Sequence, residues 1–249
     1  MNLWAAGGYD LYWTESELHT NLMILLNIAG ALALGLLVGY ERSYHGRAAG
    51  MRTYGFVCMA SAALTVLAAY PHEWFGGHGP TGLVVDPTRV IQGVVTGIGF
   101  LGAGVIMKEG FTISGLTTAA SIWAASAIGV LVGIGFYAAA IALAVMSAGL
   151  MMWGAKLEGW LPSRPAIAVV VRFRKGFVVQ ESDLKRRAHA WGYTLAMGSL
   201  AITYQDQQPE WQFVAVAHGR RKGAPFSRLA SELALVDGIE GFRLYPARN

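Results

Sequence analysis

The stretch of this chain that most restricts its fold is an apolar region rich in small residues. It runs from Arg89 to Tyr137, and after Arg89 its only charged residues are Lys108 and Glu109. Helices that face lipid usually carry Leu, Ile and Phe, whereas Gly, Ala and Ser mark faces where helix backbones approach each other. The region is therefore predicted to form the packed centre of a helical membrane protein.

A long run without charge supports this prediction. Between Glu109 and Lys156 lie 46 residues, and none of them is charged. As one straight helix this run would extend about 70 Å at ~1.5 Å per residue, which is more than twice the ~30 Å of a bilayer core. The chain must therefore turn back, and we expect the break at residues 133–135, Gly-Ile-Gly. A charge at the bilayer centre costs at least about 2.5 kcal/mol, so its absence over this length favours a membrane.

Apolar windows predict five membrane-spanning helices. Hydrophobic residues make up 54% of the chain and charged residues 14%, whereas soluble domains carry about 25% charged residues. No proline interrupts the five windows, so straight helices are expected. An N-terminal tail, 1–20, precedes a membrane domain, 21–155, whose expected spans are 21–40, 53–70, 89–107, 116–133 and 136–154.

The distribution of basic residues predicts how the chain crosses the membrane. The first loop, residues 41–52, carries three arginines and one glutamate, whereas the N-terminal tail has three acidic residues and no Lys or Arg. Loops rich in Lys and Arg stay on the cytoplasmic side. We therefore expect the N-terminus outside and, after five crossings, the C-terminus in the cytoplasm.

The composition changes at a linker over residues 156–165, and the chain beyond it reads as a soluble domain, 166–249. Residues 162–249 carry 13 Lys and Arg against 7 Asp and Glu, whereas residues 1–161 carry 6 against 8. Anionic lipid would attract such a basic region, and nucleic acid would attract it too. A soluble domain tethered near the membrane requires neither, and we expect no nucleic-acid partner.

The residue pattern of this domain predicts a small α+β fold. Runs of β-branched and alternating residues predict strands, and two segments have helical spacing. The order strand–helix–strand–strand–helix–strand is that of the ferredoxin-like fold. The expected strands are 166–173, 200–204, 211–217 and 241–245, and the expected helices are 181–191 and 226–235.

Several motifs of the membrane domain resemble the signature of the MgtC/SapB family of bacterial inner-membrane proteins. These motifs are Gly97–Gly110 with Gly115–Ala120, and Gly39–Arg42 with Gly46–Thr53. The resemblance covers roughly residues 22–154. It implies a five-helix domain in the bacterial inner membrane, often followed by a cytoplasmic ACT-like domain. In that membrane, the outside N-terminus expected from the basic residues would be periplasmic. At Thr117 and Ala124 the chain departs from the virulence-associated branch, which typically has Asn and Cys there.

The resemblance also implies a function. Family members are linked to adaptation to low magnesium and, in virulence-related members, to survival in host cells. One branch is associated with inhibition of the proton-translocating ATP synthase, so we expect a non-enzymatic regulator in the lipid bilayer with a membrane-protein partner, and a homodimer stays open. The alternative is a magnesium or small-solute transporter or channel. We expect no enzymatic activity, cofactor or bound metal, because the spans hold no catalytic arrangement of Ser, His, Asp or Cys.

Glycines form the first group of candidate site residues. Gly97, Gly99 and Gly102 match the dinucleotide-binding pattern GxGxxG. Nucleotide binding would need a preceding strand and an acidic residue about 20 positions further on, and the sequence supplies neither. Close helix packing explains the spacing better. The glycines expected at helix contacts are Gly93, Gly97, Gly99, Gly102, Gly104 and Gly115.

Charged residues beside the first and third spans form the second group. Their simplest role is to anchor helix ends at the membrane interface. A sharper hypothesis is a charged cytoplasmic cluster in which Glu41 pairs with Arg47 or Arg52, and which recognises a partner's loop or a lipid phosphate. The cluster comprises Glu41, Arg42, Arg47, Arg52, Lys108 and Glu109.

Polar residues of the family motif complete the set. Asp86 is expected to cap the third span, and Arg89 to anchor it. The loop before this span also holds two histidines and a second carboxylate, but their spacing does not support a cation site. Hydroxyl side chains in the small-residue region are expected to hydrogen-bond between helices. The motif residues are Thr53, Asp86, Arg89, Thr117 and Thr118.

Overall fold

The computed structural model describes most of the chain in two compact units. One unit holds Met1–Ile106 with Gly115–Ala155, and the other holds Met107–Ser114 with Lys156–Asn249. Parts of the expected N-terminal tail, of the loop before the third span and of the linker lie outside the described residues. The described residues are 14–47, 49–74, 86–109, 112–160, 164–219 and 223–247.

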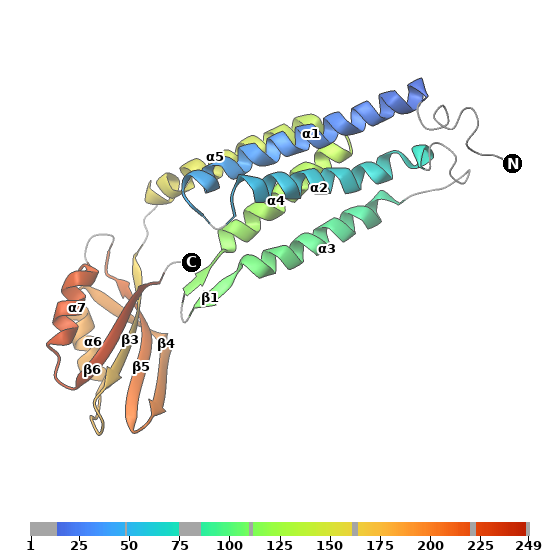
Figure 1. Ribbon diagram of the computed structural model, residues 1–249. Coiled ribbons are helices and arrows are strands. Elements are labelled where there is room, and N and C mark those ends of the chain that lie inside the picture. The colour runs from blue at the N-terminus through green and yellow to red at the C-terminus, as the bar shows by residue number, and fades with distance from the viewer. Residues whose placement is uncertain are drawn as a thin grey trace. The chain divides into compact units, whose positions relative to one another are not determined.

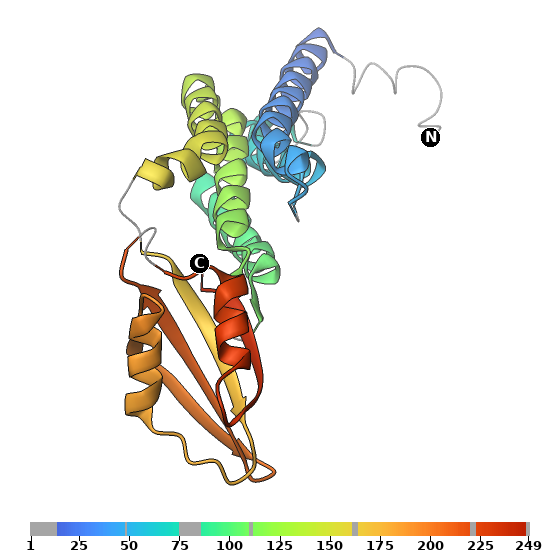
Figure 2. The ribbon, with the colours of Figure 1, turned by 90° about the vertical axis from the view of Figure 1, so that its left-hand side faces the viewer.

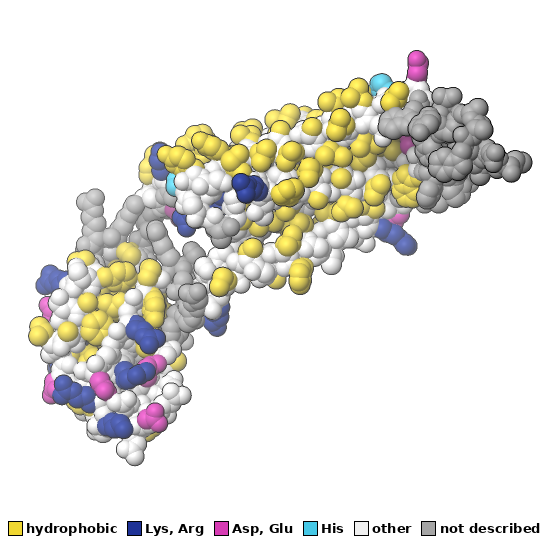
Figure 3. Space-filling view, in the orientation of Figure 1, with side chains coloured by type: hydrophobic (Ala, Val, Ile, Leu, Met, Phe, Trp, Pro, Cys, Tyr) yellow, Lys and Arg dark blue, Asp and Glu magenta, His cyan; other side chains and the backbone are white. Residues whose placement is uncertain are grey.

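Five helices in the first part of the chain are long and apolar enough to cross a membrane (Figure 1). Apolar side chains are spread over the visible surface of these helices, and charged side chains gather near their ends (Figure 3). The predicted helical membrane class is therefore confirmed. The helices are α1 (Glu15–Tyr44), α2 (Met51–Ala69), α3 (Pro87–Val105), α4 (Leu116–Gly133) and α5 (Tyr137–Trp160).

Local signals set several of the helix ends. Asp86 begins α3, because its carboxylate accepts a hydrogen bond from the backbone N–H of Thr88 at 2.9 Å. Hydrogen bonds from the hydroxyl and the amide of Thr88 hold the pKa of Asp86 below its usual value. Gly135 has φ of 88°, a left-handed conformation that ends α4 and lets α5 begin two residues later. The structure therefore has the expected break between these two helices.

Helix α4 is, together with α2, the most buried helix of the bundle. It packs against α1, α2 and α3, and its residues Ile122, Ala125 and Ile128 are buried in the apolar core. Helix α3 contributes only Val94 and Ile98 as buried residues. Of the helices in the small-residue region, α4 is thus well buried, whereas α3 lies at the periphery. The equally buried α2 precedes that region.

A short β-hairpin that the sequence did not predict connects α3 to α4. Its strands β1 (Met107–Glu109) and β2 (Thr112–Ser114) pair antiparallel, with Lys108 opposite Ile113. The expected third span continued to residue 107, whereas the helix ends at Val105. Strands of three residues are too short to show a period in sequence.

The second unit contains a four-stranded antiparallel sheet in the order β4-β5-β3-β6. Both of its helices cover the same face of the sheet (Figure 2). This is the strand order of a ferredoxin-like fold and confirms the predicted α+β class. The elements are β3 (Ala166–Phe173), α6 (Glu181–Ala190), β4 (Tyr193–Gln205), β5 (Gln208–Ala217), α7 (Phe226–Ala234) and β6 (Ile239–Pro246).

Strand β4 begins seven residues earlier than the expected strand at 200–204. Its pairing with β5 shifts register between Ala196 and Ala201. Within this irregular segment the hydroxyl of Ser199 accepts a hydrogen bond from the backbone N–H of Val214 at 2.8 Å. The bulge interrupts the apolar alternation, so only the part of the strand that follows it was visible in the sequence.

Candidate functional site

The glycines of α3 do not bring helices of this chain together. At Gly102 an added Cβ would lie 3.7 Å from the Cβ of Ala119, which is an ordinary van der Waals distance. A packing role for the other four requires a helix of another molecule. A Cβ would find no described atom of another segment within 4 Å at Gly93, Gly97, Gly99 and Gly104.

Glycines on α1 make the first close contact between helices. A Cβ added at Gly35 would lie 2.6 Å from the carbonyl oxygen of Tyr54, and one at Gly39 would lie 2.7 Å from the Cα of Met51. Real Cβ atoms do not approach backbone atoms this closely, so only glycine fits at these two positions. The pair has the small-xxx-small spacing that lets helix backbones touch, here between α1 and α2.

A second pair of glycines, on α4, contacts α2 further towards its C-terminal end. A Cβ added at Gly133 would lie 2.6 Å from the Cβ of Thr65, and one at Gly129 would overlap the carbonyl oxygen of Cys58. Helix α2 thus makes close contacts with both α1 and α4 through two glycine pairs. Sequence reasoning missed both pairs, although the same four-residue spacing marks them.

Gly115 is required by the backbone at the start of α4. Its φ is 88°, and a Cβ there would overlap the carbonyl oxygen of Val105. Non-glycine residues rarely adopt this conformation, so the left-handed turn and the close approach both select glycine. Of the six predicted glycines, this one has a clear role within the chain.

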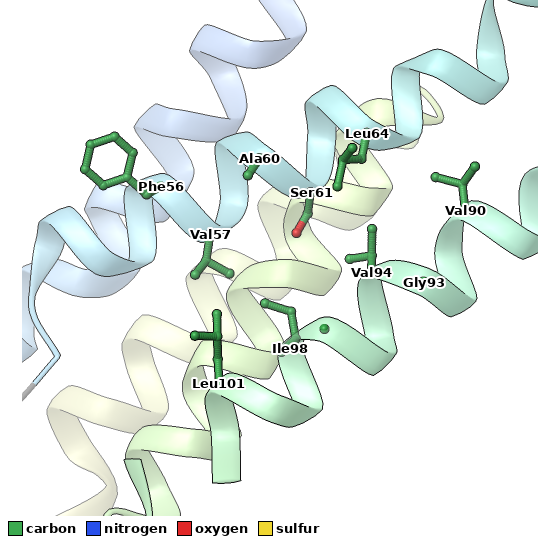
Figure 4. A pocket seen from close by; sticks show the side chains of 11 residues that line it. Phe56, Val57, Ala60, Ser61, Leu64, Val90, Gly93, Val94, Ile98 and Leu101 are labelled. Atoms are coloured by element: carbon green, nitrogen blue, oxygen red, sulfur yellow. The ribbon is translucent and has the colours of Figure 1, made fainter. Parts of the chain in front are cut away.

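Helices α2 and α3 border an apolar groove of about 540 Å³ (Figure 4). From α3, Gly93 and Gly97 lie in its lining beside Val94. From α2, Phe56 and Leu64 line it while remaining substantially exposed. The glycines that lack neighbours in this chain therefore belong to an open, apolar surface.

The predicted charged cluster forms different pairs from those expected. Oε1 of Glu41 lies 3.0 Å from Nδ1 of His45, one turn along the same helix. This local pair replaces the expected partners Arg47 and Arg52. The side chain of Glu109 lies outside the described residues. Three basic members are exposed and form no ion pair with a described carboxylate: Arg47, Arg52 and Lys108.

Arg42 is the buried member of this cluster. It lies in the last turn of α1 and is only 8% exposed. Its Nη2 donates a hydrogen bond to Oγ1 of Thr118, in the first turn of α4, over 2.5 Å. The structure thus brings together one residue from the predicted charged cluster and one from the predicted motif group.

Hydroxyl contacts continue this polar region between α2 and α4. The hydroxyls of Tyr54 and Ser121 are 2.5 Å apart, and those of Ser61 and Ser126 are 2.8 Å apart. Sequence reasoning did not single out the α2 members. Ser61 follows Tyr54 by seven positions, and Thr65 follows Ser61 by four, so all three lie on one face of α2. This spacing of hydroxyl residues was the sequence signal that could have identified them.

The remaining motif residues lie elsewhere. Arg89 is exposed, and its Nε is 3.8 Å from Oδ2 of Asp86 at the start of α3. Thr53 and Thr117 are exposed on the first turns of α2 and α4. Within the described ranges, the His, Cys, Asp and Glu side chains form no group of three that could hold a metal ion.

Comparison with known proteins finds similarity to one family. The sequence model of the MgtC family matches residues 28–160. The MgtC protein of Brucella abortus (strain 2308) is 44% identical over 108 residues, which are 43% of this chain and 41% of that protein. The MgtC protein of Salmonella typhimurium (strain LT2) is 40% identical over 122 residues, 49% of this chain and 48% of that protein. The match thus spans less than half of these curated relatives, and no solved structure matches significantly.

Proposed function

The chain belongs to the MgtC family, and from this premise we propose that it is a non-enzymatic regulator in the bacterial inner membrane. It acts by binding a transmembrane helix of another membrane protein in the groove between α2 and α3. The single observation that carries the proposal is that a Cβ added at either glycine lining this groove would meet no described atom within 4 Å. The orientation that goes with it is a periplasmic N-terminus and a cytoplasmic C-terminus.

A helix suits this groove better than lipid does. Gly93 and Gly97 are four residues apart, the spacing at which two helix backbones can meet along one face. Faces that contact only lipid gain nothing from glycine, and glycine costs an exposed helix about 1 kcal/mol relative to alanine. Phe56 and Leu64 on the facing helix supply the apolar wall against which an incoming helix would pack.

The family suggests which partner to test first. Resemblance to this family links the chain to growth at low magnesium and to inhibition of the ATP synthase, so membrane subunits of that enzyme are the first candidates. The second compact unit, with its ACT-like order of elements, would stand in the cytoplasm beside such a complex. Transport of magnesium or a small solute is the competing function.

Site-specific photocrosslinking in native membranes tests the proposal. A photoreactive residue replaces Phe56, which lines the groove and is 63% exposed, or Met146, which lies on α5 and is 64% exposed. We expect the first position to capture one integral membrane protein at low magnesium, and the second to capture none. Gly97→Leu should abolish the capture without unfolding the chain, because no described atom opposes a side chain there.

Two other results would contradict a partner of a different kind. Capture of only a second copy of the chain would replace the heterologous partner with a homodimer. Capture of nothing at either magnesium concentration would contradict the proposal, and metal flux into proteoliposomes would then test the transport alternative.

A further inference from the structure

Two histidines of the second unit lie with their rings close together. The ring centroids of His189 and His218 are 4.6 Å apart, and the ring planes are tilted by 58° to each other. Aromatic pairs that attract each other prefer offset-stacked or edge-to-face arrangements, and this tilt belongs to neither. Ring–ring attraction therefore does not account for the approach, whereas a ligand shared by the two imidazoles would account for it.

Backbone hydrogen bonds hold the two histidines near each other. His189 lies in the last turn of α6, and His218 directly follows β5. Gly192 donates its N–H to the carbonyl oxygen of His189 at 3.0 Å, and its own carbonyl oxygen accepts the N–H of His218 at 2.9 Å. The φ of Gly192 is 82°, a conformation that favours glycine. The fold therefore fixes the backbone from which both imidazoles extend, as a binding site requires.

Both imidazoles are accessible to a ligand. His189 is exposed and His218 is partly exposed, so an ion can reach the pair from solvent. Of the histidine rings in the described ranges, only that of His45 takes part in a hydrogen bond or an ion pair. A neutral imidazole offers one ring nitrogen as an acceptor or as a metal ligand. The pair thus presents two nitrogen ligands that no described side chain occupies.

The separation of the rings fits two ligands on one metal ion. With metal–nitrogen bonds of about 2.1 Å, each ring centroid would lie about 3.2 Å from the ion. A right angle between the two bonds then places the centroids about 4.5 Å apart, and the tetrahedral angle places them about 5.2 Å apart. The observed 4.6 Å fits the right angle. Such angles are typical of Cu²⁺ and Ni²⁺ bound by nitrogen and oxygen ligands.

We propose that His189 and His218 together bind a divalent late transition metal ion of the Cu²⁺ or Ni²⁺ type. Water fills the other coordination positions, because the described His, Cys, Asp and Glu side chains supply no third ligand. The ion joins the end of α6 to the end of β5 and stabilises the folded unit to which it binds. Sequence reasoning expected no bound metal, since two histidines this far apart along the chain form no ligand motif. The site is independent of the helix-binding groove, which lies in the other unit.

Copper titration of the purified full chain, prepared without a polyhistidine tag, tests the proposal. Electron paramagnetic resonance of bound Cu²⁺ reports how many imidazoles coordinate the ion. We expect one ion per chain with two imidazoles, and no competition from Mg²⁺, which prefers oxygen ligands. His218→Gln should leave one imidazole on the ion and lower the affinity about tenfold or more. His19→Gln, at an exposed position of α1, is the matched control and should bind copper as the wild type does.

His189→Gln provides a second, independent variant that should also leave one imidazole on the ion. Both substitutions replace side chains that reach solvent, so both variants should fold. A wild-type spectrum with a single imidazole would overturn the proposal, as would a His189→Gln or His218→Gln protein that binds copper as His19→Gln does. One ion per two chains, with imidazoles from both copies, would contradict a site built by one chain.

Discussion

Arg42 and Thr118 are joined by a 2.5 Å hydrogen bond, from Nη2 to Oγ1, although 76 positions separate them in the sequence. The contact ties the last turn of α1 to the first turn of α4. The bond therefore fixes the position of α1 against α4 at the end where the expected first loop begins. The next contact along this face, between Tyr54 and Ser121, does the same for α2.

Loss of the Thr118 hydroxyl should destabilise the membrane unit. Thr118→Val removes the one described acceptor of a buried guanidinium, and a lost hydrogen bond to a charged group costs about 1.5–3 kcal/mol. Thr117→Val changes the neighbouring, exposed threonine in the same way and should alter stability by less than about 0.5 kcal/mol. Unfolding of both variants by SDS in mixed micelles measures the difference. Equal stability of the two variants would show that the bond contributes nothing.

Alanine at two glycines should separate internal packing from an open surface. Gly129→Ala places a Cβ against the backbone carbonyl of Cys58, which cannot rotate away, so a loss of about 1–3 kcal/mol is expected. Gly97→Ala meets no described atom and should be neutral or stabilising by up to about 1 kcal/mol. Thermal unfolding in detergent provides the comparison. A similar loss in both variants would contradict the peripheral position of α3.

The five helices were predictable because each depends on a property of a contiguous segment. Apolar residues fill a window of membrane length, no proline interrupts it, and charges collect outside it. The turn between α4 and α5 was predictable for a similar reason. Its left-handed backbone at Gly135 favours glycine, and this residue is visible in the sequence. The ferredoxin-like order of elements was predictable from the local alternation of apolar and polar residues. Only the start of β4 was predicted wrongly, because the bulge near Ser199 interrupts that alternation.

The candidate site was less predictable because it depends on which helix faces meet. Three glycine pairs, at positions 35 and 39, 93 and 97, and 129 and 133, have the same spacing, yet among the described residues only the first and third touch another helix closely. Likewise, four cationic residues were predicted to cluster, and the rotation of α1 buries only Arg42 among them. Spacing identifies a face that can pack, but it does not identify what covers that face.

A contact between α1 and α5 should contribute little energy but show clear coupling. The hydroxyl of Tyr137 donates to Oδ1 of Asn27 at 2.7 Å. Hydrogen bonds between membrane helices average about 0.6 kcal/mol and reach at most ~1.7 kcal/mol. A double-mutant cycle with Tyr137→Phe and Asn27→Ala should return a coupling energy in that range. Tyr40→Phe, at an exposed position of α1, should show no coupling to Asn27→Ala. Strict additivity of the first pair would mean that the bond does not persist.

The second unit should lose part of its stability in acid through Glu210. This carboxylate accepts hydrogen bonds from Gln212 at 2.9 Å and from Arg172 at 3.2 Å, and these contacts hold the pKa of Glu210 below its usual value. A carboxyl whose pKa is lower in the folded state stabilises the fold above the unfolded pKa of about 4.3. That stabilisation is lost as the pH falls through the lower, folded value.

Glu210→Gln should therefore be less stable than the wild type at pH 7 and should lose less stability on acidification to pH 3. Urea unfolding of residues 164–249 measures both differences, with the fluorescence of Trp191 and Trp211 as the signal. Glu232→Gln removes a carboxylate whose nearest cation, on Arg228, is 4.0 Å away, and it should retain the wild-type pH dependence. If Glu210→Gln follows the wild-type pH dependence as well, the contacts of Glu210 with Gln212 and Arg172 do not stabilise the sheet, and the acid sensitivity of the unit arises from other carboxylates.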